Sequence, residues 1–457
     1  MSDSGPTAPV GNPHPVTPPS RRSVLKGLAA GAGLAVAPAS VLAACSSSAK
    51  KPGGSSSSSS SSGGSAQAGG TISFGSNYSD AAPKAAFASL CTAATAKTGT
   101  KITINTTDHN TFQNNISSYL QGTPDDLATW FAGYRMQFFA AQDLLTPLDD
   151  VWADIGGTFN EAGKSLSKGI DGKYYFVPLY NYPWVVFYNK STFSSKGYTV
   201  PTTWDEFVAL AKQMQKDGLV PLAFADKDGW PALGTFDIIN MRLNGYDYHI
   251  KLMKHEVPWT DKGVTDVFNQ WAEILPYCQR GATGRIWEDA AKTLENKKAG
   301  MMFQGSNQVA ANYSKANLAD LDFFVYPTIN TQFGTDYMDA PTDGFILPKK
   351  AKNVDGAKAV LKYIGTGAAE ETFLKTDAWD TGLANGLVAP SYNAIQKKAV
   401  TEIGKCKNVA QFMDRDTVPD MATAMIKAIQ SFIDDPSKSN IASIQKSAEN
   451  QAKSIFS

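Results

Sequence analysis

Runs typical of strands alternate with runs typical of helices from Gly70 onward. The β-prone run 71–74 predicts a strand, and a helical stretch over 84–97 follows it. Gly99 closes that helix, and the alternating run 101–106 predicts the next strand. Strand, helix and strand in this order indicate a βαβ unit, and therefore an α/β fold with a largely parallel sheet.

The same alternation continues through the rest of the chain. Thr203 and Glu206 have the spacing of a capping box, which predicts an amphipathic helix that ends at Asp217-Gly218. Further strands are predicted over 220–225 and 299–303, and late helices over 355–363 and 421–433. With 457 residues, 42% of them hydrophobic, the chain is too long for one compact core, so two cores are expected.

The N-terminal residues have a different pattern, in which a basic stretch precedes a weakly apolar run. The stretch 20–26 contains a pair of arginines, and the run 27–44 is too short and small-sided for a membrane span. The arginine pair resembles a twin-arginine export signal, and the sequence LAAC at 42–45 resembles a lipobox. This resemblance implies that 1–44 is a signal peptide, removed after the Cys45 thiol has been acylated with a fatty acid such as palmitate.

A segment rich in Ser and Gly, 45–69, follows this signal. It contains an unbroken serine run over 55–62 and cannot bury enough apolar surface to fold. About 25 residues of such a flexible tether reach roughly 25–30 Å on average. We therefore expect an exported domain that is lipid-anchored through Cys45 to the outer face of the cytoplasmic membrane.

The charge balance argues against one class of partner. The chain has 42 basic and 42 acidic residues, and three basic and one acidic residue precede Cys45, so the remainder carries a net charge of −2. A polyanion-binding protein needs a concentrated basic face, so nucleic acid is not expected as a partner. No other segment reaches about 18 apolar residues, so the expected membrane contact is through lipid alone.

Cysteine usage predicts neither a disulfide framework nor a metal site. After lipidation of Cys45, the remaining thiols are Cys91, Cys278 and Cys406, an odd number without CxxC spacing. Cys91 lies in an apolar helical run and is expected to be a small buried hydrophobe. The sequence leaves open whether Cys278 and Cys406 pair.

Histidine usage and the lack of catalytic motifs predict a protein that is not an enzyme and needs no cofactor. After removal of the signal peptide, the histidines are His109, His249 and His255, and none has the spacing of a metal-ligand motif. The sequence has no GxSxG elbow, P-loop lysine or GxGxxG. A secreted glycoside hydrolase remains an alternative, because spacing alone does not dismiss a pair of catalytic carboxylates.

A series of short motifs gives the chain a family resemblance. In chain order they are LQGTPD at 120–125, AAQDLLTPL at 140–148, DGKYYFVP at 171–178, FYNK at 187–190, PTTWDEF at 201–207, KAGMMFQGS at 298–306 and APTDGF at 340–345. Each motif is weak alone, but their order is specific. By this series, which covers nearly all of the chain after the tether, the sequence resembles the family-1 extracellular solute-binding proteins of carbohydrate ABC importers.

The resemblance implies a type II clamshell like that of periplasmic binding proteins, an α/β fold of two lobes, each a mostly parallel sheet flanked by helices. By the family pattern, lobe one takes 70–177 and 329–375, and lobe two takes 178–328 and 376–457. The solute binds in the cleft between the lobes, which close about a hinge, and the closed form docks on the importer's membrane permease. The expected protein is a monomer that captures a sugar or oligosaccharide outside the cell.

Sugar recognition needs aromatic planes for C–H faces, and carboxylates or amides for hydroxyls. Loops after predicted strands and at the lobe crossings supply such side chains. The candidate ligand-binding residues are Asn77, Asp108, Trp130, Tyr134, Arg135, Tyr180, Asn181, Tyr182, Trp184, Trp230, Arg285, Trp287, Gln304, Ser306, Asp343, Trp379 and Asp380. A non-sugar solute is the other alternative, although a polyamine calls for a carboxylate-dominated cleft and an anion for arginines or helix N-termini.

Some candidates also have a purely structural explanation. Asp108 suits the cap of the helix that follows it, and Asp343 suits a turn. Trp230, Trp287 and Trp379 lie in polar segments that bear glycine, where an indole is costly unless something covers it. These three tryptophans are therefore the expected platforms for a sugar ring.

Overall fold

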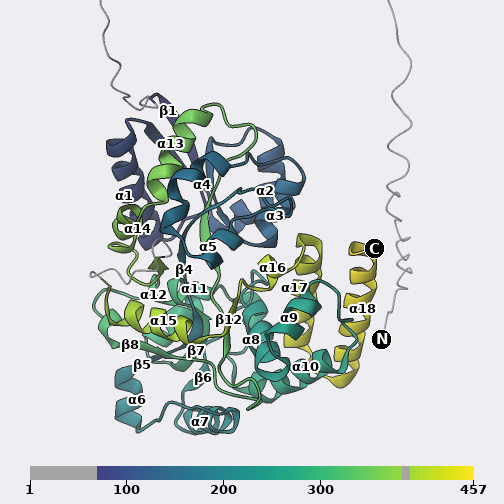
Figure 1. The fold of residues 1–457 in the computed structure, drawn as a ribbon. Coiled ribbons are helices and arrows are strands. Elements are labelled where there is room, and N and C mark those ends of the chain that lie inside the picture. The colour runs from purple at the N-terminus through teal and green to yellow at the C-terminus, as the bar shows by residue number, and fades with distance from the viewer. Residues whose placement is uncertain (1–68, 383–391) are drawn as a thin grey trace, which may run out of the picture. The chain divides into compact units, whose positions relative to one another are not determined.

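The computed structural model of the protein describes residues 69–382 and 392–457, so the expected signal peptide and Cys45 lie outside it, with all but the last residue of the expected tether. Strands and helices alternate as the apolar pattern indicated, and they build two main sheets (Figure 1). We call the part around the six-stranded sheet lobe one and the part around the four-stranded sheet lobe two. The expected α/β fold of two lobes is confirmed.

The strands of lobe one are ordered β11-β4-β10-β3-β1-β2. Their bounds are β1 (Thr71–Ser76), β2 (Lys101–Thr106), β3 (Leu127–Phe131), β4 (Val177–Asn181), β10 (Thr342–Ile346) and β11 (Thr381–Gly382). β1 is parallel to β2 and β3, whereas β10 is antiparallel to β3 and β4, and β11 is antiparallel to β4. The sheet is therefore mixed, not mostly parallel as expected, because β10 returns from a later part of the chain into its centre.

Helices cover both faces of this sheet, as two neighbouring residues of β10 show. Phe345 packs against Phe74 of β1 and Phe87 of α1 (Ala81–Thr98), at ring-centroid distances of 5.3 Å and 6.0 Å. Ile346 packs on the other face, in the cluster formed with α2 (His109–Gln121) and α3 (Tyr134–Ala141), because successive side chains of a strand alternate between faces. The two apolar faces of the sheet therefore carry separate helix layers.

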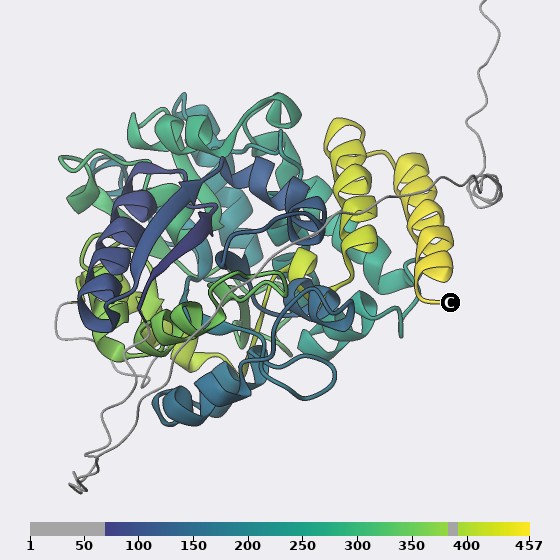
Figure 2. The same ribbon diagram turned by 90° about the horizontal axis from the view of Figure 1, so that it is seen from above.

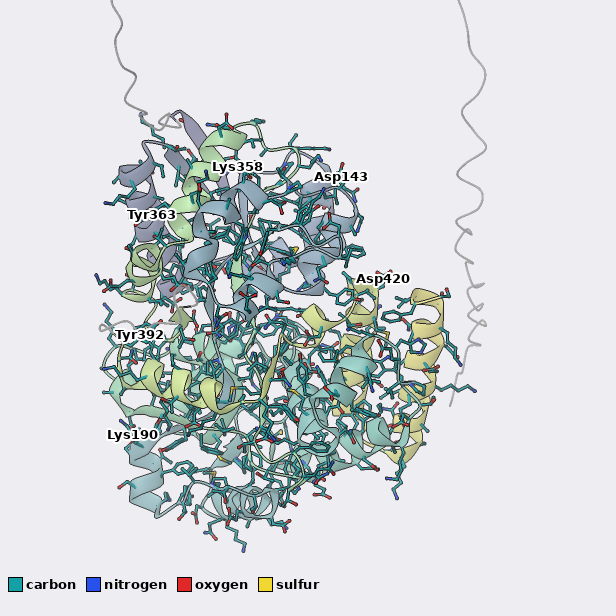
Figure 3. All side chains as sticks on the ribbon, viewed as in Figure 1. Asp143, Lys190, Lys358, Tyr363, Tyr392 and Asp420 are labelled. Atoms are coloured by element: carbon teal, nitrogen blue, oxygen red, sulfur yellow. The ribbon has the colours of Figure 1, made fainter. Side chains whose placement is uncertain are left out.

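The helix layer on the α1 face continues into later parts of the chain. α1 packs against α13 (Val354–Ile364) and α14 (Gly367–Leu374), and α13 packs against α4 (Asp149–Ile155). Lys358 of α13, labelled in Figure 3, donates to Asp150 of α4 at 2.8 Å. The short helix α5 (Glu161–Leu166) leads towards β4. Segments far apart in the sequence thus complete lobe one.

The sheet of lobe two is also mixed. Its order is β6-β7-β5-β8, with bounds β5 (Trp184–Asn189), β6 (Val220–Leu222), β7 (Ala299–Gly305) and β8 (Leu321–Phe324). β6 is parallel to β7, and β5 is antiparallel to β7 and β8. The predicted capping box opens α7 (Trp204–Lys216), because the Thr203 hydroxyl and the Glu206 carboxylate each accept from the other residue's backbone N–H.

The other elements of lobe two surround this sheet or extend from it. They are α6 (Lys190–Lys196), α8 (Leu233–Asn244), α9 (Tyr246–Met253), α10 (Lys262–Ile274), α11 (Trp287–Glu295), α12 (Ser306–Ala310), α15 (Ala394–Lys405), α16 (Met413–Asp416), α17 (Pro419–Asp434) and α18 (Lys438–Ile455). A small parallel pair joins β9 (Tyr337–Asp339) to β12 (Asn408–Ala410). Figure 2 shows α17 and α18 side by side, and α18 also packs against α10.

The chain crosses between the lobes at positions that differ from the expected boundaries. Lobe one was expected to end at 177, but β4 continues to Asn181 within its sheet. Pro178 does not end this strand, because β10 has a bulge between Asp343 and Gly344 where it pairs with β4. Further along, β9 pairs with β12, whereas β10 lies within the sheet of lobe one, and β11 at 381–382 still pairs with β4 of that sheet.

The described residues contain three cysteines, all of them free, and Cys91 is buried on α1 as predicted. Burial raises the pKa of the Cys91 thiol to about 12. Within the same residues, every helix is too short or too polar to cross a membrane.

Candidate ligand-binding site

A hollow lies where the two lobes meet. Its lining comes from lobe one through Asn77, Tyr78, Ser79, Asp80, Pro83, His109, Tyr180 and Asp343, and from lobe two through Trp230, Trp287, Asn307, Gln308 and Ala311. The lobe-one residues lie in the loop after β1, at the start of α1 and α2, and on β4 and β10. This main hollow has the setting of a small-molecule site, because loops at the ends of strands converge on it.

Three rings from the two lobes form an aromatic wall of the main hollow. The centroids of Trp230 and Trp287 are 5.2 Å apart, and His109 lies 6.1 Å and 6.0 Å from them. Trp287 is the first residue of α11, and Trp230 lies in the loop before α8. The wall offers apolar ring faces of the kind that the C–H face of a sugar needs.

Several polar atoms around the main hollow have no hydrogen-bond partner within the described part of the chain. They include Oε1 of Gln308, Oδ1 of Asn307 and Nε1 of Trp287. An unpaired buried polar group costs about 1–3 kcal/mol, so these atoms favour a ligand that carries both donors and acceptors. A polyhydroxylated molecule meets this requirement.

His109 is a neutral member of the wall at physiological pH. Its Nε2 atom lies 2.6 Å from Nε2 of Gln113, one turn further along α2. Burial, and then the charge of Arg415, lower the pKa of His109 to about 4. Its imidazole therefore adds a ring face and a hydrogen-bonding edge to the hollow without adding charge.

The polar floor beside this wall is paired internally. Asp343 accepts from the Tyr180 hydroxyl at 3.1 Å and from Nη1 of Arg415 at 2.7 Å. Nη2 of Arg415 also donates to the Tyr182 hydroxyl at 3.0 Å, and its guanidinium carbon lies 4.1 Å from the Phe131 ring centroid. Burial raises the pKa of Asp343, which the charge of Arg415 opposes. The floor is a buried ion pair held in place by two tyrosines.

The ion pairs of α16 join lobe two to lobe one. Asp414 accepts from Nη1 of Arg135 on α3 at 2.8 Å, and the neighbouring Arg415 reaches Asp343 on β10. A side hollow next to α16 is lined by His109, Gln113, Tyr182, Trp184, Trp230, Gln308, Phe412, Asp414 and Arg415. It shares His109, Trp230 and Gln308 with the main hollow, so the two form a continuous region between the lobes.

The structure brings about half of the candidate residues to this region. Asn77, Tyr180, Trp230, Trp287 and Asp343 line the main hollow. Tyr182 and Trp184 line the side hollow, and Arg135 lines a third, outer hollow that also contacts Trp230.

The structure places the remaining candidates away from the lining, and each has another role or position. Asp108 caps α2 by accepting from the Thr111 backbone, and Arg285 donates to the carbonyls of Phe224 and Arg280. Trp130 and Trp379 are buried in the apolar clusters of lobe one and lobe two respectively. The others are Tyr134 on the first turn of α3, Asn181 bonded to Thr381 at the sheet edge, Gln304 and Ser306 buried around the end of β7, and Asp380 buried before β11.

The main omissions from the candidate list are His109, Gln308 and Arg415. His109 directly follows the candidate Asp108, so the sequence points to this loop but not to the residue that lines the hollow. Gln308 lies two residues beyond the candidate Ser306, on α12. Arg415 lies on a four-residue helix near the C-terminal end of the chain, and no local sequence pattern marks it.

The fold and the site define a two-lobed solute-binding protein. It has two lobes, a hollow lined from both of them, and an aromatic wall beside polar groups. The chain belongs to the bacterial extracellular solute-binding proteins, whose family model matches residues 78–371. This membership confirms the class that the motif series predicted. No group of three or more His, Cys, Asp or Glu side chains suited to a metal ion occurs in residues 69–382 and 392–457.

Solved structures are similar over most of the chain. The crystal structure of the bacterial solute receptor AcbH has 76% sequence identity and a TM-score of 0.84, and the match covers 85% of this chain and 100% of that chain. AcbH has an exclusive substrate preference for β-D-galactopyranose.

Curated relatives are more distant. An uncharacterized ABC transporter extracellular-binding protein of Pyrococcus horikoshii is 27% identical over 298 residues, which covers 63% of this chain and 64% of that protein. The alpha-glucosides-binding periplasmic protein AglE of Rhizobium meliloti is 26% identical over 277 residues, covering 55% and 59%. The chain therefore spans less than two thirds of the length of these relatives.

Proposed function

We propose that this protein captures a single sugar ring outside the cell, with β-D-galactopyranose as its solute, and delivers it to an ABC importer. The main hollow carries this proposal, because its aromatic wall lies beside polar atoms that have no partner among residues 69–382 and 392–457. The 76% identity to AcbH, with its exclusive preference for that sugar, supports the choice of galactose.

In the proposed complex, the apolar face of the sugar packs on Trp230 or Trp287 and its hydroxyls pair with Gln308, Asn307 and Trp287 Nε1. These groups belong to lobe two, and Asn77, Tyr78 and His109 lie on the lobe-one side of the same hollow. A ligand in contact with both sides favours the closed arrangement of the lobes over an open one. The closed form then docks on the membrane permease as a monomer.

We propose binding without catalysis. The relatives named above are solute-binding proteins, and the buried carboxylate of the floor is engaged by an arginine. Asp343 pairs with Arg415 and accepts from Tyr180, so it is not free to act as an acid or a nucleophile. If a galactoside incubated with the protein is cleaved, the glycoside hydrolase alternative replaces this proposal.

The proposed location is the outer face of the cytoplasmic membrane, through a lipid on Cys45 and the tether over 45–69. The membership in an extracellular family and the twin-arginine and lipobox resemblance support it. The Cys45→Ala variant is expected to leave the membrane fraction or to keep its signal peptide. Equal mass and equal detergent partitioning of variant and parent would remove the lipid anchor from the proposal.

Calorimetric titration of the purified protein with single sugars tests the solute. Galactose is expected to bind. Glucose differs in the orientation of one hydroxyl and is expected to bind at least about tenfold more weakly, because a site built around a hydroxyl rejects a ligand that misplaces it. A polyamine and an organic anion serve as controls for the non-sugar alternative. Saturable binding of either one, together with no heat from galactose, would overturn the sugar proposal.

A further inference from the structure

A buried carboxyl group lies near the start of the loop that carries Trp230. The loop connects β6 to α8, and Asp226 precedes Trp230 in it. The side chain of Asp226 is completely buried, although an aspartate usually lies at the surface. Asp226 lines none of the three hollows described above, so it does not touch a solute bound there. The proposed function therefore leaves this residue without a role.

Asp226 closes a tight turn around Trp230. Its Oδ1 atom accepts a hydrogen bond from the backbone N–H of Ala232 at 2.8 Å. Its backbone carbonyl accepts from the N–H of Gly229 at 3.1 Å. Trp230 lies between these two hydrogen-bonded residues, and its Nε1 atom donates to Oδ1 of Asn110 on α2 at 3.1 Å. The position of the indole in the site therefore depends on the turn that Asp226 closes.

Neighbouring segments hold this turn from outside. The N–H of Asp226 donates to the carbonyl of Ala282 at 2.8 Å, and Nε2 of Gln430 on α17 donates to the Asp226 carbonyl at 2.8 Å. Gly229 has a φ of 80°, and a Cβ there would lie 2.2 Å from Cγ2 of Ile426, also on α17. Glycine suits such a left-handed position this close to a helix. The turn therefore cannot shift as a unit without losing these contacts.

The second carboxyl oxygen of Asp226 is unpaired. Oδ2 has no hydrogen-bond partner within residues 69–382 and 392–457. The nearby guanidinium of Arg285 donates instead to the carbonyls of Phe224 and Arg280. The charged residues on the loop and on the two segments packed against it are Lys227, Asp228, Arg280, Arg285, Lys427 and Asp434. An ionised Asp226 is therefore a buried charge without a paired cation in the described part of the chain.

Asp226 keeps its proton at neutral pH. Burial, and then the charges of Asp228 and Asp434, raise the pKa of Asp226 to about 8, although the hydrogen bond from Ala232 opposes this rise. A carboxyl group with a raised pKa favours the arrangement that buries it while it is protonated, and this preference is lost as the pH rises through about 8. An opened turn would let the carboxylate reach water. The geometry of the turn and the protonation of Asp226 are therefore linked.

We infer that Asp226 is a positioning residue for the sugar site, because its protonated carboxyl group closes the turn that presents the Trp230 indole. Ionisation of Asp226 opens this turn and weakens galactose binding, although Asp226 does not touch the sugar. The inference rests on the proposed function, since it assigns how a binding face of the same site is held. It gives the site a dependence on alkaline pH that comes from one carboxyl group outside the lining.

Calorimetric titration with galactose at about pH 7.5 and about pH 9.5 tests this role. The affinity of the parent protein is expected to fall by about tenfold, and by no more than about 30-fold, because the higher pH lies about 1.5 units above the pKa of Asp226. The Asp226→Asn variant keeps an oxygen for the Ala232 N–H and is uncharged at both pH values, so most of this fall is expected to disappear. Burial raises the pKa of Glu288, beside Trp287, to about 7, so the difference between parent and variant is the readout.

Asp237→Asn is the matched control. Asp237 on α8 is also completely buried, its Oδ2 atom accepts from the Met413 N–H at 2.7 Å, and its Oδ1 atom has no hydrogen-bond partner among the described residues. Because Asp237 lies outside the Trp230 turn, this variant is expected to show the same alkaline fall as the parent protein. The inference is overturned if the parent and Asp226→Asn fall equally, or if Asp237→Asn loses the fall as Asp226→Asn does.

Hydrogen exchange of the sugar-free parent protein is a second test, and it decides alone if Asp226→Asn does not fold. After correction for the intrinsic exchange rate, the protection of peptide 226–236 is expected to fall by about tenfold from about pH 7.5 to about pH 9.5, because the turn opens. The protection of α7 in the same sample is the internal control and should stay constant. Equal protection of 226–236 at both pH values would overturn the inference.

Failure of the parent protein to bind galactose at either pH would be a failure of the proposed function. Hydrogen exchange needs no sugar, so it still decides whether Asp226 closes the turn.

Discussion

The aromatic wall and the polar floor of the site differ in whether their polar atoms are already paired. The wall, formed by Trp230, Trp287 and His109, borders atoms such as Oε1 of Gln308 that have no partner in the described residues. In the floor, the carboxylate of Asp343 is held by Arg415 and Tyr180. Polar atoms beside the wall therefore need a ligand for their hydrogen bonds, whereas the floor already joins the two lobes through its ion pair without a ligand.

The largest effect is expected on breaking the floor. The Arg415→Met variant leaves the carboxylate of Asp343 buried without its cation, and removal of one partner from a buried pair costs about 3–5 kcal/mol. The free energy of unfolding, from urea titration, should fall by that amount. Lys349→Met is the control, because Lys349 and Asp143 form an exposed pair worth less than about 1 kcal/mol. Equal effects in both variants would contradict the division between floor and wall.

A pH effect of intermediate size is expected from the wall. The pKa of His109 is lowered to about 4 from an ordinary value of 6.5, so the unfolded chain binds this proton first as the pH falls. The contribution of His109 to stability is complete above pH 6.5 and is lost between pH 6.5 and about 4, by up to about 3 kcal/mol. Urea unfolding of His109→Gln should show a shallower fall over this range than the parent protein. Parallel pH profiles would contradict a buried, neutral His109.

The smallest expected effect is on galactose binding, and it distinguishes the unpaired polar atoms beside the aromatic wall from polar groups that are already paired. The Gln308→Met variant removes an unpaired acceptor, so the free energy of galactose binding should weaken by about 1–3 kcal/mol. The free energy of unfolding should stay constant or rise slightly, because no hydrogen bond within the described residues is lost. Gln411→Met is the matched control, because Gln411 accepts from the Thr342 backbone at 3.0 Å and is buried. That variant should lose stability instead. Calorimetric titration and urea unfolding of both variants give the comparison, and a loss of stability in Gln308→Met would show that its amide is paired in solution.

Local patterns in the sequence predicted local structure well. The capping box at Thr203 and the strand over 101–106 depend on residues close together in the chain, and both occur as expected. The class of protein followed from motif order. The direction of the strands did not follow from the sequence, because β10 lies between strands from remote segments and pairs antiparallel with both.

The site was harder to predict, because a loop position does not tell which way a side chain faces. Trp230 and Trp379 have similar local sequence, yet Trp230 lines the hollow and Trp379 packs inside lobe two. Asp108 and His109 are adjacent, yet one caps α2 and the other lines the hollow. Arg415 enters the floor only through contacts with distant strands, which no local pattern encodes.

The central position of β10 also bears on the order in which a growing chain acquires structure. Its place between β3 and β4 stays empty until residues 342–346 have been synthesised, and the edge strand β11 comes later still. The sheet of lobe two needs only residues 184–324. Lobe one begins first on the ribosome, but all strands of the sheet of lobe two are synthesised before the sheet of lobe one is complete. Until β10 has been synthesised, β3 and β4 lack the strand that joins them.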